Sequence, residues 1–193
     1  MSELLQFFLS FEVKEEPDWV ENRLQYASGN VIGDKAKYKF RVIGKGKIIA
    51  IFEVQDYSLM NQITSEITRN GFCNLTCTPL THLESWQKLL GYSSSQCNYP
   101  HRLSGNEELL WFEVGYDDGI SKEEFNILWE RGTQSMIHQL REGQIGIEIF
   151  KVLGERRLYG FTSKKKNEDW ETHLWSFQAE DKIYKNAKLV TKI

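Results

Sequence analysis

Apolar and polar residues alternate in short runs along much of the chain, and one run guides the interpretation of the rest. The stretch from Lys37 to Val54, KYKFRVIGKGKIIAIFEV, has an apolar run on each side of Gly44-Lys45-Gly46. Runs of branched and aromatic residues that flank a glycine turn are typical of a β-hairpin. The sequence therefore predicts a hairpin over these residues.

The hairpin pattern occurs a second time. Residues from Ile149 to Thr162, IFKVLGERRLYGFT, repeat it at a shift of 110 positions, which aligns Gly44 with Gly154. The triplet Phe11-Glu12-Val13 recurs as Phe112-Glu113-Val114 at a shift of 101. Internal similarity at this spacing predicts a duplicated half of roughly 90 residues. Because the shift grows between the two alignments, we expect a shorter first helix in the first half.

The first half has a regular order of predicted elements. Residues 4–13 are nearly all apolar, which is typical of a strand with both faces covered. Pro17 suits the first turn of one helix, and Asp56 precedes a second helix that ends before Gly71. With the hairpin and a last strand over 72–80, the order is that of a ferredoxin-like βαββαβ unit.

The second half repeats this order after a connecting segment. Ser121 and Glu124 form a capping box at the start of a helix that runs to Glu142. A later helix is expected around Trp170, Leu174 and Phe177. Strands are predicted at 108–114, 145–153, 158–163 and 187–191. The predicted domains are a first repeat (1–80), a connecting helix and linker (81–107) and a second repeat (108–193).

The fold class indicated by this order is α+β, with two ferredoxin-like repeats. A four-stranded antiparallel sheet with both helices on one side leaves its other face in water, and these strands are apolar on both faces. At ~25 cal/mol per Å², covering several hundred Å² of apolar surface contributes on the order of 10 kcal/mol. We therefore expect the two sheets to pack on each other as an intrachain α+β barrel, a pseudo-dimer within one chain that can assemble further as a homo-oligomer.

Composition adds limits on partners and location. Of 193 residues, 40% are apolar and 26% charged, and the net charge of −3 does not favour a nucleic-acid partner. Arg156-Arg157 with Lys164-Lys165-Lys166 is interpreted as a solvated rim. No apolar run approaches the ~20 residues that span a bilayer, and no signal peptide is evident, so we expect a cytoplasmic protein without a membrane partner. Cys73 and Cys77 are expected in the core. The three cysteines are an odd number without a CxxC spacing, so we expect neither a disulfide framework nor a zinc site.

Several motifs resemble the muconolactone isomerases. They are the segments Phe40-Arg41-Val42-Ile43-Gly44-Lys45, Ile51-Phe52-Glu53-Val54 and Thr78-Pro79-Leu80. The similarity covers most of residues 4–80 and, more weakly, 108–191, where the TPL ending is missing. Members of that family are small α+β-barrel proteins that pair their sheets between two chains. The resemblance implies proton transfer without a cofactor, as in the isomerisation of a lactone double bond, and related barrels include polyketide cyclases and monooxygenases.

Candidate catalytic residues are those that supply a base, a proton carrier and an anion partner. Glu12 and Glu113 lie on apolar strands, where burial would raise a carboxyl pKa, and either is a candidate base. His82 is a candidate proton carrier, and Arg41 is a candidate anion partner. Each also has a structural interpretation: a strand-end carboxylate or ion pair, a polar connector residue, and an exposed sheet residue.

Candidate ligand-binding residues are Trp19, Tyr26, Glu148 and Lys151. The two aromatic residues share one flank of the first helix, and Glu148 is the only charge in the apolar segment 145–150. Lys151 is equivalent to Arg41. Core packing and surface exposure are the alternative interpretations. A haem or metal site would need a positioned histidine, and the four histidines show no ligand spacing, so we expect no cofactor.

Two functions are consistent with these patterns. The first is an isomerase or cyclase that acts by proton transfer on a small oxygenated cyclic or aromatic compound. The second is a non-catalytic module for ligand binding or protein assembly that keeps the barrel fold. An enclosed pocket with an ionisable group in its wall separates the first from the second.

Overall fold

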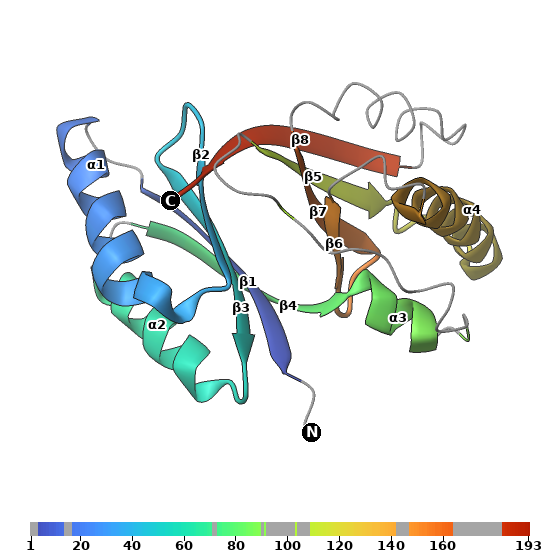
Figure 1. The fold of residues 1–193 in the computed structure, drawn as a ribbon, viewed down its shortest axis with the longest axis horizontal. Coiled ribbons are helices and arrows are strands. Elements are labelled where there is room, and N and C mark those ends of the chain that lie inside the picture. The colour runs from blue at the N-terminus through green and yellow to red at the C-terminus, as the bar shows by residue number, and fades with distance from the viewer. Residues whose placement is uncertain are drawn as a thin grey trace. The chain divides into compact units, whose positions relative to one another are not determined.

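A computed structural model describes the protein over residues 4–13, 17–70, 73–89, 91, 103, 109–141, 147–163 and 183–193. The chain divides into two compact units (Figure 1). The first unit comprises Met1–Leu80 with Val190–Ile193, and the second comprises Thr81–Leu189. Each unit has its own antiparallel sheet and its own helices.

The first unit has the βαββαβ order predicted from the sequence. Its elements are β1 (Leu5–Val13), α1 (Pro17–Tyr26), β2 (Tyr38–Val42), β3 (Lys47–Val54), α2 (Ser58–Arg69) and β4 (Cys73–His82). A π-helical turn (Ala27–Ile32) and a 3-10 turn (Gly33–Lys35) follow α1. The strand order is β4-β1-β3-β2, and the end of β8 (Ile183–Lys192) pairs with β2.

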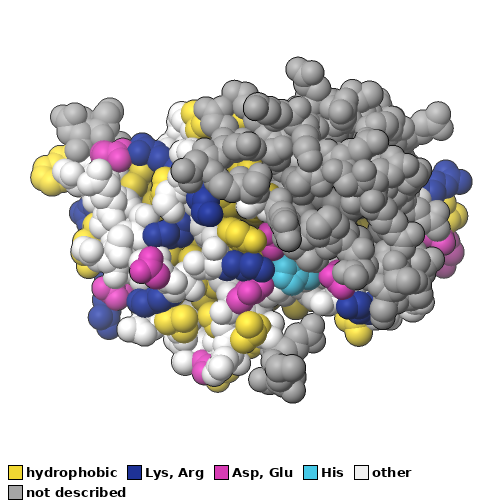
Figure 2. Space-filling model, viewed as in Figure 1, with side chains coloured by type: hydrophobic (Ala, Val, Ile, Leu, Met, Phe, Trp, Pro, Cys, Tyr) yellow, Lys and Arg dark blue, Asp and Glu magenta, His cyan; other side chains and the backbone are white. Residues whose placement is uncertain are grey.

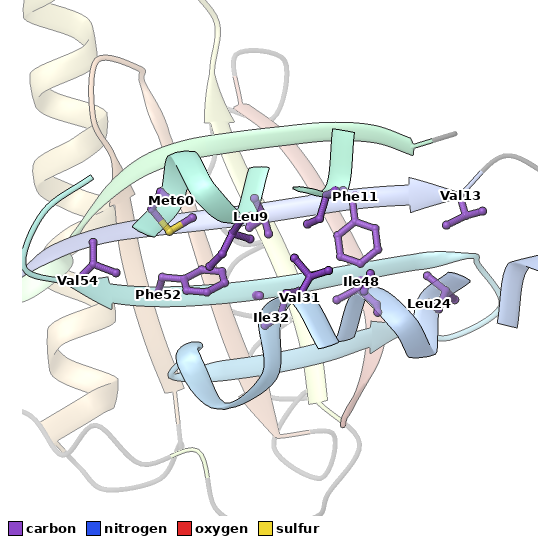
Figure 3. Packing of buried hydrophobic residues seen from close by; sticks show 14 residues of the cluster. Leu9, Phe11, Val13, Leu24, Val31, Ile32, Ile48, Phe52, Val54 and Met60 are labelled. Carbon is purple, nitrogen blue, oxygen red and sulfur yellow. The ribbon is translucent and has the colours of Figure 1, made fainter. Parts of the chain in front are cut away.

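Helices α1 and α2 cover one face of this sheet, and an apolar core of 14 residues lies between them (Figure 3). Side chains that alternate along β1, Leu9 and Phe11 among them, point into this core together with Phe52 of β3. The other face of β1 is buried too, because Phe8 and Ser10 are inaccessible. The prediction of a first strand covered on both faces is therefore confirmed.

The second unit contains five strands or strand ends and two described helices. Its elements are α3 (Leu83–Leu89), β5 (Leu109–Tyr116), α4 (Lys122–Arg141), β6 (Ile147–Val152), β7 (Arg157–Ser163) and β8. The strand order is β8-β5-β7-β6-β4. Strands β4 and β8 thus end both orders, and the combined order is that of a closed eight-stranded barrel, as expected.

The two hairpins have the same register. Phe40 pairs with Ile49 in the first, and Phe150 pairs with Tyr159 in the second, at the predicted shift of 110. Gly44 and Gly154 occupy the same turn position with φ of 75° and 78°, a backbone conformation that glycine adopts without strain. The helix expected around Trp170, Leu174 and Phe177 lies outside the described residues, so the complete tandem repeat stays a prediction.

The halves differ as predicted in their first helices. Helix α1 has 10 residues, whereas α4 has 20. In α4 the side chain of Trp129 is buried and that of Ile127 is exposed, so the helix has distinct inner and outer faces. The Ser121 hydroxyl accepts a hydrogen bond from the Glu124 backbone N–H at 3.1 Å, as expected for the cap of this helix.

The prediction for Cys77 was wrong, because its side chain is exposed rather than in the core. Its strand, β4, is the edge of the four-stranded order, and the core under the helices is formed by β1, β3 and the helices themselves. The only β4 side chain packed against that core, within the described residues, is Leu75. The side chain of Cys73 lies outside the described residues.

The surface that Figure 2 shows carries Lys and Arg side chains interspersed with Asp and Glu side chains over the described residues. Mixed charge of this kind is what the sequence indicated. Among the described helices, none is both long and apolar enough to cross a membrane.

Gly160 provides a test of how tightly the second unit is packed. A Cβ atom at this position would lie 1.9 Å from Cζ of Phe112, whose residue is its direct partner on β5. We expect Gly160→Ala to lower the free energy of unfolding by about 1–3 kcal/mol, because one of the two residues must move. Urea denaturation measures this change, and the double variant with Phe112→Leu should recover part of the loss.

Gly29→Ala is the matched control, because a Cβ there meets nothing within 4 Å. We expect it to be neutral or slightly stabilising in its helical turn. Equal effects of the two substitutions would contradict the packing of Phe112 over Gly160.

Candidate functional site

The sheet of the second unit presents two chemically different faces. One face packs on helix α4, through Tyr116, whose ring lies 5.3 Å from that of Phe125 and 5.9 Å from that of Trp129. Strand register places a second set of side chains on the opposite face. We call this set the Glu113 face, and it consists of Trp111, Glu113, Glu148, Phe150, Tyr159 and Phe161.

Glu113 is the centre of an ion pair on this face. Its carboxylate lies 2.9 Å from Nη1 of Arg157, and the two side chains are 12% and 41% exposed. Arg157 also contacts the Glu155 carboxylate, with Nε at 3.3 Å. Glu113 is thus nearly buried and held by a cation that reaches solvent.

Tyr159 completes the group. It lies directly opposite Glu113 on β7 and hydrogen-bonds to Arg157. Because a guanidinium only donates, the phenol oxygen is the acceptor of that bond, and the phenol keeps its own proton as a donor. Burial raises the pKa of Tyr159 above its ordinary value, so the proton is retained at neutral pH.

Aromatic rings surround this polar group. Trp111 packs edge-on against Tyr159, with ring centroids 6.2 Å apart, and Nζ of Lys188 lies 5.4 Å above the Trp111 ring. Phe161 is fully buried and lies opposite Trp111 in the strand register. A face with a carboxylate, a phenol and a guanidinium among aromatic rings has the composition typical of a small-molecule site.

His82 and Glu148 belong to the same unit but not to the same group. The His82 ring lies 4.9 Å from that of Phe150, which is the partner of Tyr159 across β6 and β7. Glu113 and His82 lie on strands β5 and β4, which are separated by β7 and β6 in the strand order. Glu148 is fully buried and lies opposite Phe161 of β7. Phe161 is two residues after Tyr159, the partner of Glu113.

Lys151 lies on the other face of the sheet, toward the helices. Its side chain is 4% exposed, with Nζ 5.2 Å from the ring centroid of Trp86 and 5.8 Å from that of Trp129. The ammonium donates to the carbonyl oxygens of Val152 and Glu155. Burial lowers the pKa of Lys151 to about 8.

In the first unit the predicted residues do not come together. Arg41 forms an ion pair with Glu21 of α1, at 2.7 Å, on the helix-covered side where its partner Ile48 joins the core. Glu12 points to the opposite face and lies across from Lys47. Since Glu12 and Arg41 occupy opposite faces, the structure does not combine them in one site.

Trp19 and Tyr26 do not line an enclosed pocket. Their side chains are 62% and 42% exposed on α1, so a role in ligand binding would be at the surface. The space between α1, α2 and the sheet is filled by the apolar core instead.

Sequence reasoning missed Arg157 and Tyr159 as site residues. The prediction of a solvated rim overlooked that the Arg157 guanidinium, although 41% exposed, binds Glu113 and Tyr159. The missed signal is the period of two along β7, which places Arg157 and Tyr159 on one face. Arg156, from the same rim, donates to the Ile120 carbonyl at 2.9 Å and stacks on Phe125.

The described side chains contain no group of three or more potential metal ligands. His82 is the one histidine whose side chain is described, and its ring stacks on Phe150. The side chains of His101, His138 and His173 lie outside that part of the chain.

Comparison with known proteins gives a fold rather than a family. No family model and no curated relative matches the chain. Chlorite dismutase from Candidatus Nitrospira defluvii, solved in complex with imidazole, matches with a TM-score of 0.64 at 12% identity, over 100% of this chain and 92% of that chain. A second protein, described provisionally as a chlorite dismutase, matches with a TM-score of 0.61 at 9% identity, over 100% and 96%.

At these identities the likeness concerns the fold alone. It supports the general class of dimeric α+β barrels that the sequence indicated, but it does not support the specific resemblance to muconolactone isomerases. The chain therefore has the fold of the chlorite dismutase-like α+β barrels.

Proposed function

We propose that the second unit binds a small oxygenated cyclic or aromatic compound on the Glu113 face and moves a proton on it. The observation that carries this proposal is the position of Arg157, whose guanidinium contacts both the Glu113 carboxylate and the Tyr159 phenol. A base, a donor and a cation thus lie within one group of three side chains. The same three groups are what an isomerase without a cofactor requires.

The reaction class is set by these groups. Glu113 takes a proton from a carbon next to a carbonyl, and the electron pair of that C–H bond moves onto the carbonyl oxygen. The Tyr159 phenol donates a hydrogen bond to this oxygen, and Arg157 adds positive charge nearby. Protonated Glu113 then returns its proton to another carbon of the conjugated system, so the double bond shifts and no redox partner is needed.

The aromatic residues on this face suit a ring-shaped substrate. Trp111 and Phe161 provide apolar contacts beside the polar group, and Lys188 above Trp111 adds a second cation. Flat rings pack well against such side chains. The likeness to chlorite dismutases shows fold alone and contributes nothing to this choice of chemistry.

A second function is a non-catalytic binding or assembly module. The observation in its favour is the ion pair itself, because Arg157 neutralises the charge of Glu113 and such pairs also occur as structural contacts. Under this function the face would bind a ligand without turning it over. Turnover in the presence of bound ligand separates the two.

We expect a thermal-shift screen of lactones, hydroxyaromatic compounds and polyketide-like acids to yield a ligand whose turnover Glu113→Gln abolishes. A ligand present at 100 times its Kd stabilises the protein by about 2.7 kcal/mol, a shift that is readily detected. Loss of a general base should reduce turnover by about 10²–10⁴-fold, with the ligand still bound.

Glu12→Gln is the comparison variant, because Glu12 is the candidate base of the first unit and lies across from Lys47 in the strand register. It should retain turnover. Loss of turnover in Glu12→Gln alone would place the chemistry in the first unit. A ligand that binds but is not converted by the wild-type protein or by Glu12→Gln would establish the binding module.

A separate test concerns the donor Tyr159. Because burial raises its pKa above the ordinary value near 10, the phenol should stay protonated and turnover should not fall between pH 7 and about 9.5. Tyr159→Phe should reduce turnover about 10–100-fold with little change in ligand affinity. Measured pH profiles of the rate in both proteins provide the check.

Tyr116→Phe is the matched control, because Tyr116 is half-buried on the helix-covered face and burial raises its pKa to about 12. It should leave turnover unchanged. A rise in the rate with pH below pH 9 that Tyr159→Phe removes would mean that Tyr159 acts in its ionised form instead.

A further inference from the structure

We propose that Lys151 is a positioning residue, whose ammonium fixes the β6–β7 turn and thereby holds Arg157 against Glu113 and Tyr159. The catalytic meaning of this role rests on the proposed function of the Glu113 face. The mechanical part does not, because the position of Arg157 can be measured without a ligand.

Lys151 contacts the β6–β7 turn directly. Its Nζ lies 2.5 Å from the carbonyl oxygen of Val152 and also donates to that of Glu155. These residues stand on either side of Leu153-Gly154, so one ammonium bridges the turn from end to end. An ammonium has three donors and no acceptor, which suits two carbonyls that face each other.

The surroundings of Lys151 restrict its side chain. Helices α3 and α4 contribute the uncharged rings of Trp86 and Trp129 beside Nζ. From the turn, Glu155 is the charged residue that acts on it, and the partner on β7 is the apolar Leu158. The side chain therefore has little freedom to leave the turn.

Glu155 links the turn to the Glu113 face. Arg157 is the first residue of β7 and follows Glu155 by two positions. The Glu155 carboxylate binds Nε of Arg157 at 3.3 Å, and the guanidinium binds Glu113 at 2.9 Å. Lys151 holds the main-chain carbonyl of Glu155. Glu155 in turn is connected to Arg157 both along the main chain and through its carboxylate.

The first hairpin shows that the fold does not require this contact. Arg41 occupies the position equivalent to Lys151 but binds Glu21 of α1. The turn of the first hairpin is closed by a backbone hydrogen bond instead, which the Lys45 N–H donates to the Val42 carbonyl at 3.2 Å. A hairpin of the same register therefore forms without a side-chain bridge. We infer that the bridge in the second hairpin serves to position Arg157.

The titration of Tyr159 reports the position of Arg157, because the bond from Arg157 lowers the pKa of the phenol against the effect of burial. It is followed through the ring Cζ resonance in protein labelled with 13C-tyrosine and assigned with Tyr159→Phe. We expect the Tyr159 midpoint to rise by about half a pH unit or more in Lys151→Met. Arg157→Met gives the shift for complete loss of the contact.

Two further variants serve as controls. Lys122→Met removes an exposed lysine of the same unit and should leave the midpoint unchanged. Lys151→Arg keeps the donors and should restore much of the wild-type midpoint. A folded Lys151→Met protein with the wild-type midpoint would overturn the inference.

Wild-type protein supplies a test that does not depend on a variant folding. Between pH 6.5 and 9.5 the Tyr159 resonance should show a small step at the midpoint of the Lys151 Cε resonance, near pH 8. Absence of this step would also overturn the inference. If the Tyr159 shifts appear while Glu113→Gln changes no turnover, Lys151 still positions Arg157 and the proposed function alone fails.

Discussion

The burial of both faces of the sheet strands is the constraint on which this structure depends. In β1 and β3 most side chains are buried, with helices over one face. Charge is costly in such strands unless it is paired. Ionisable residues therefore lie at strand ends, as Glu12 does, or in a paired group, as Glu113 does with Arg157. A charged residue within these strands therefore points to a pairing partner or to a chemical role.

Local features were predictable from the sequence because each depends on a few neighbouring residues. The two hairpins, the turn glycines Gly44 and Gly154, and the cap at Ser121 follow from turn and capping chemistry. The alternation along β1 likewise places Leu9 and Phe11 on one face, and the structure shows that this face packs on the helices. The exposure of Cys77 was missed, because it depends on which parts of the sheet the helices cover rather than on neighbouring residues.

Register between distant strands is what the sequence could not supply, and the site depends on it. Leu9 pairs with Ala50 and Phe112 with Gly160, so Phe112 corresponds to Leu9 when the hairpins are aligned. Glu113 therefore corresponds to Ser10 and not to Glu12. The repeated Phe-Glu-Val triplet is offset by two residues between the sheets, and a shift of two preserves the face of every side chain. Sequence alignment alone concealed this offset.

The same offset strengthens the case for a functional role of Glu113. In the first unit the positions of Glu113 and Tyr159 are taken by Ser10 and Ile49, and both are buried there. An apolar or small residue thus satisfies the architecture at these places. Because Arg157 is 41% exposed, its ion pair with Glu113 contributes little to stability, and the pair is not explained by folding alone. The position of Arg157 is taken by Lys47 in the first unit, so a cation is common to both sheets. The second sheet adds a base and a donor where the first has Ser10 and Ile49, and this contrast supports a chemical role for Glu113 and Tyr159.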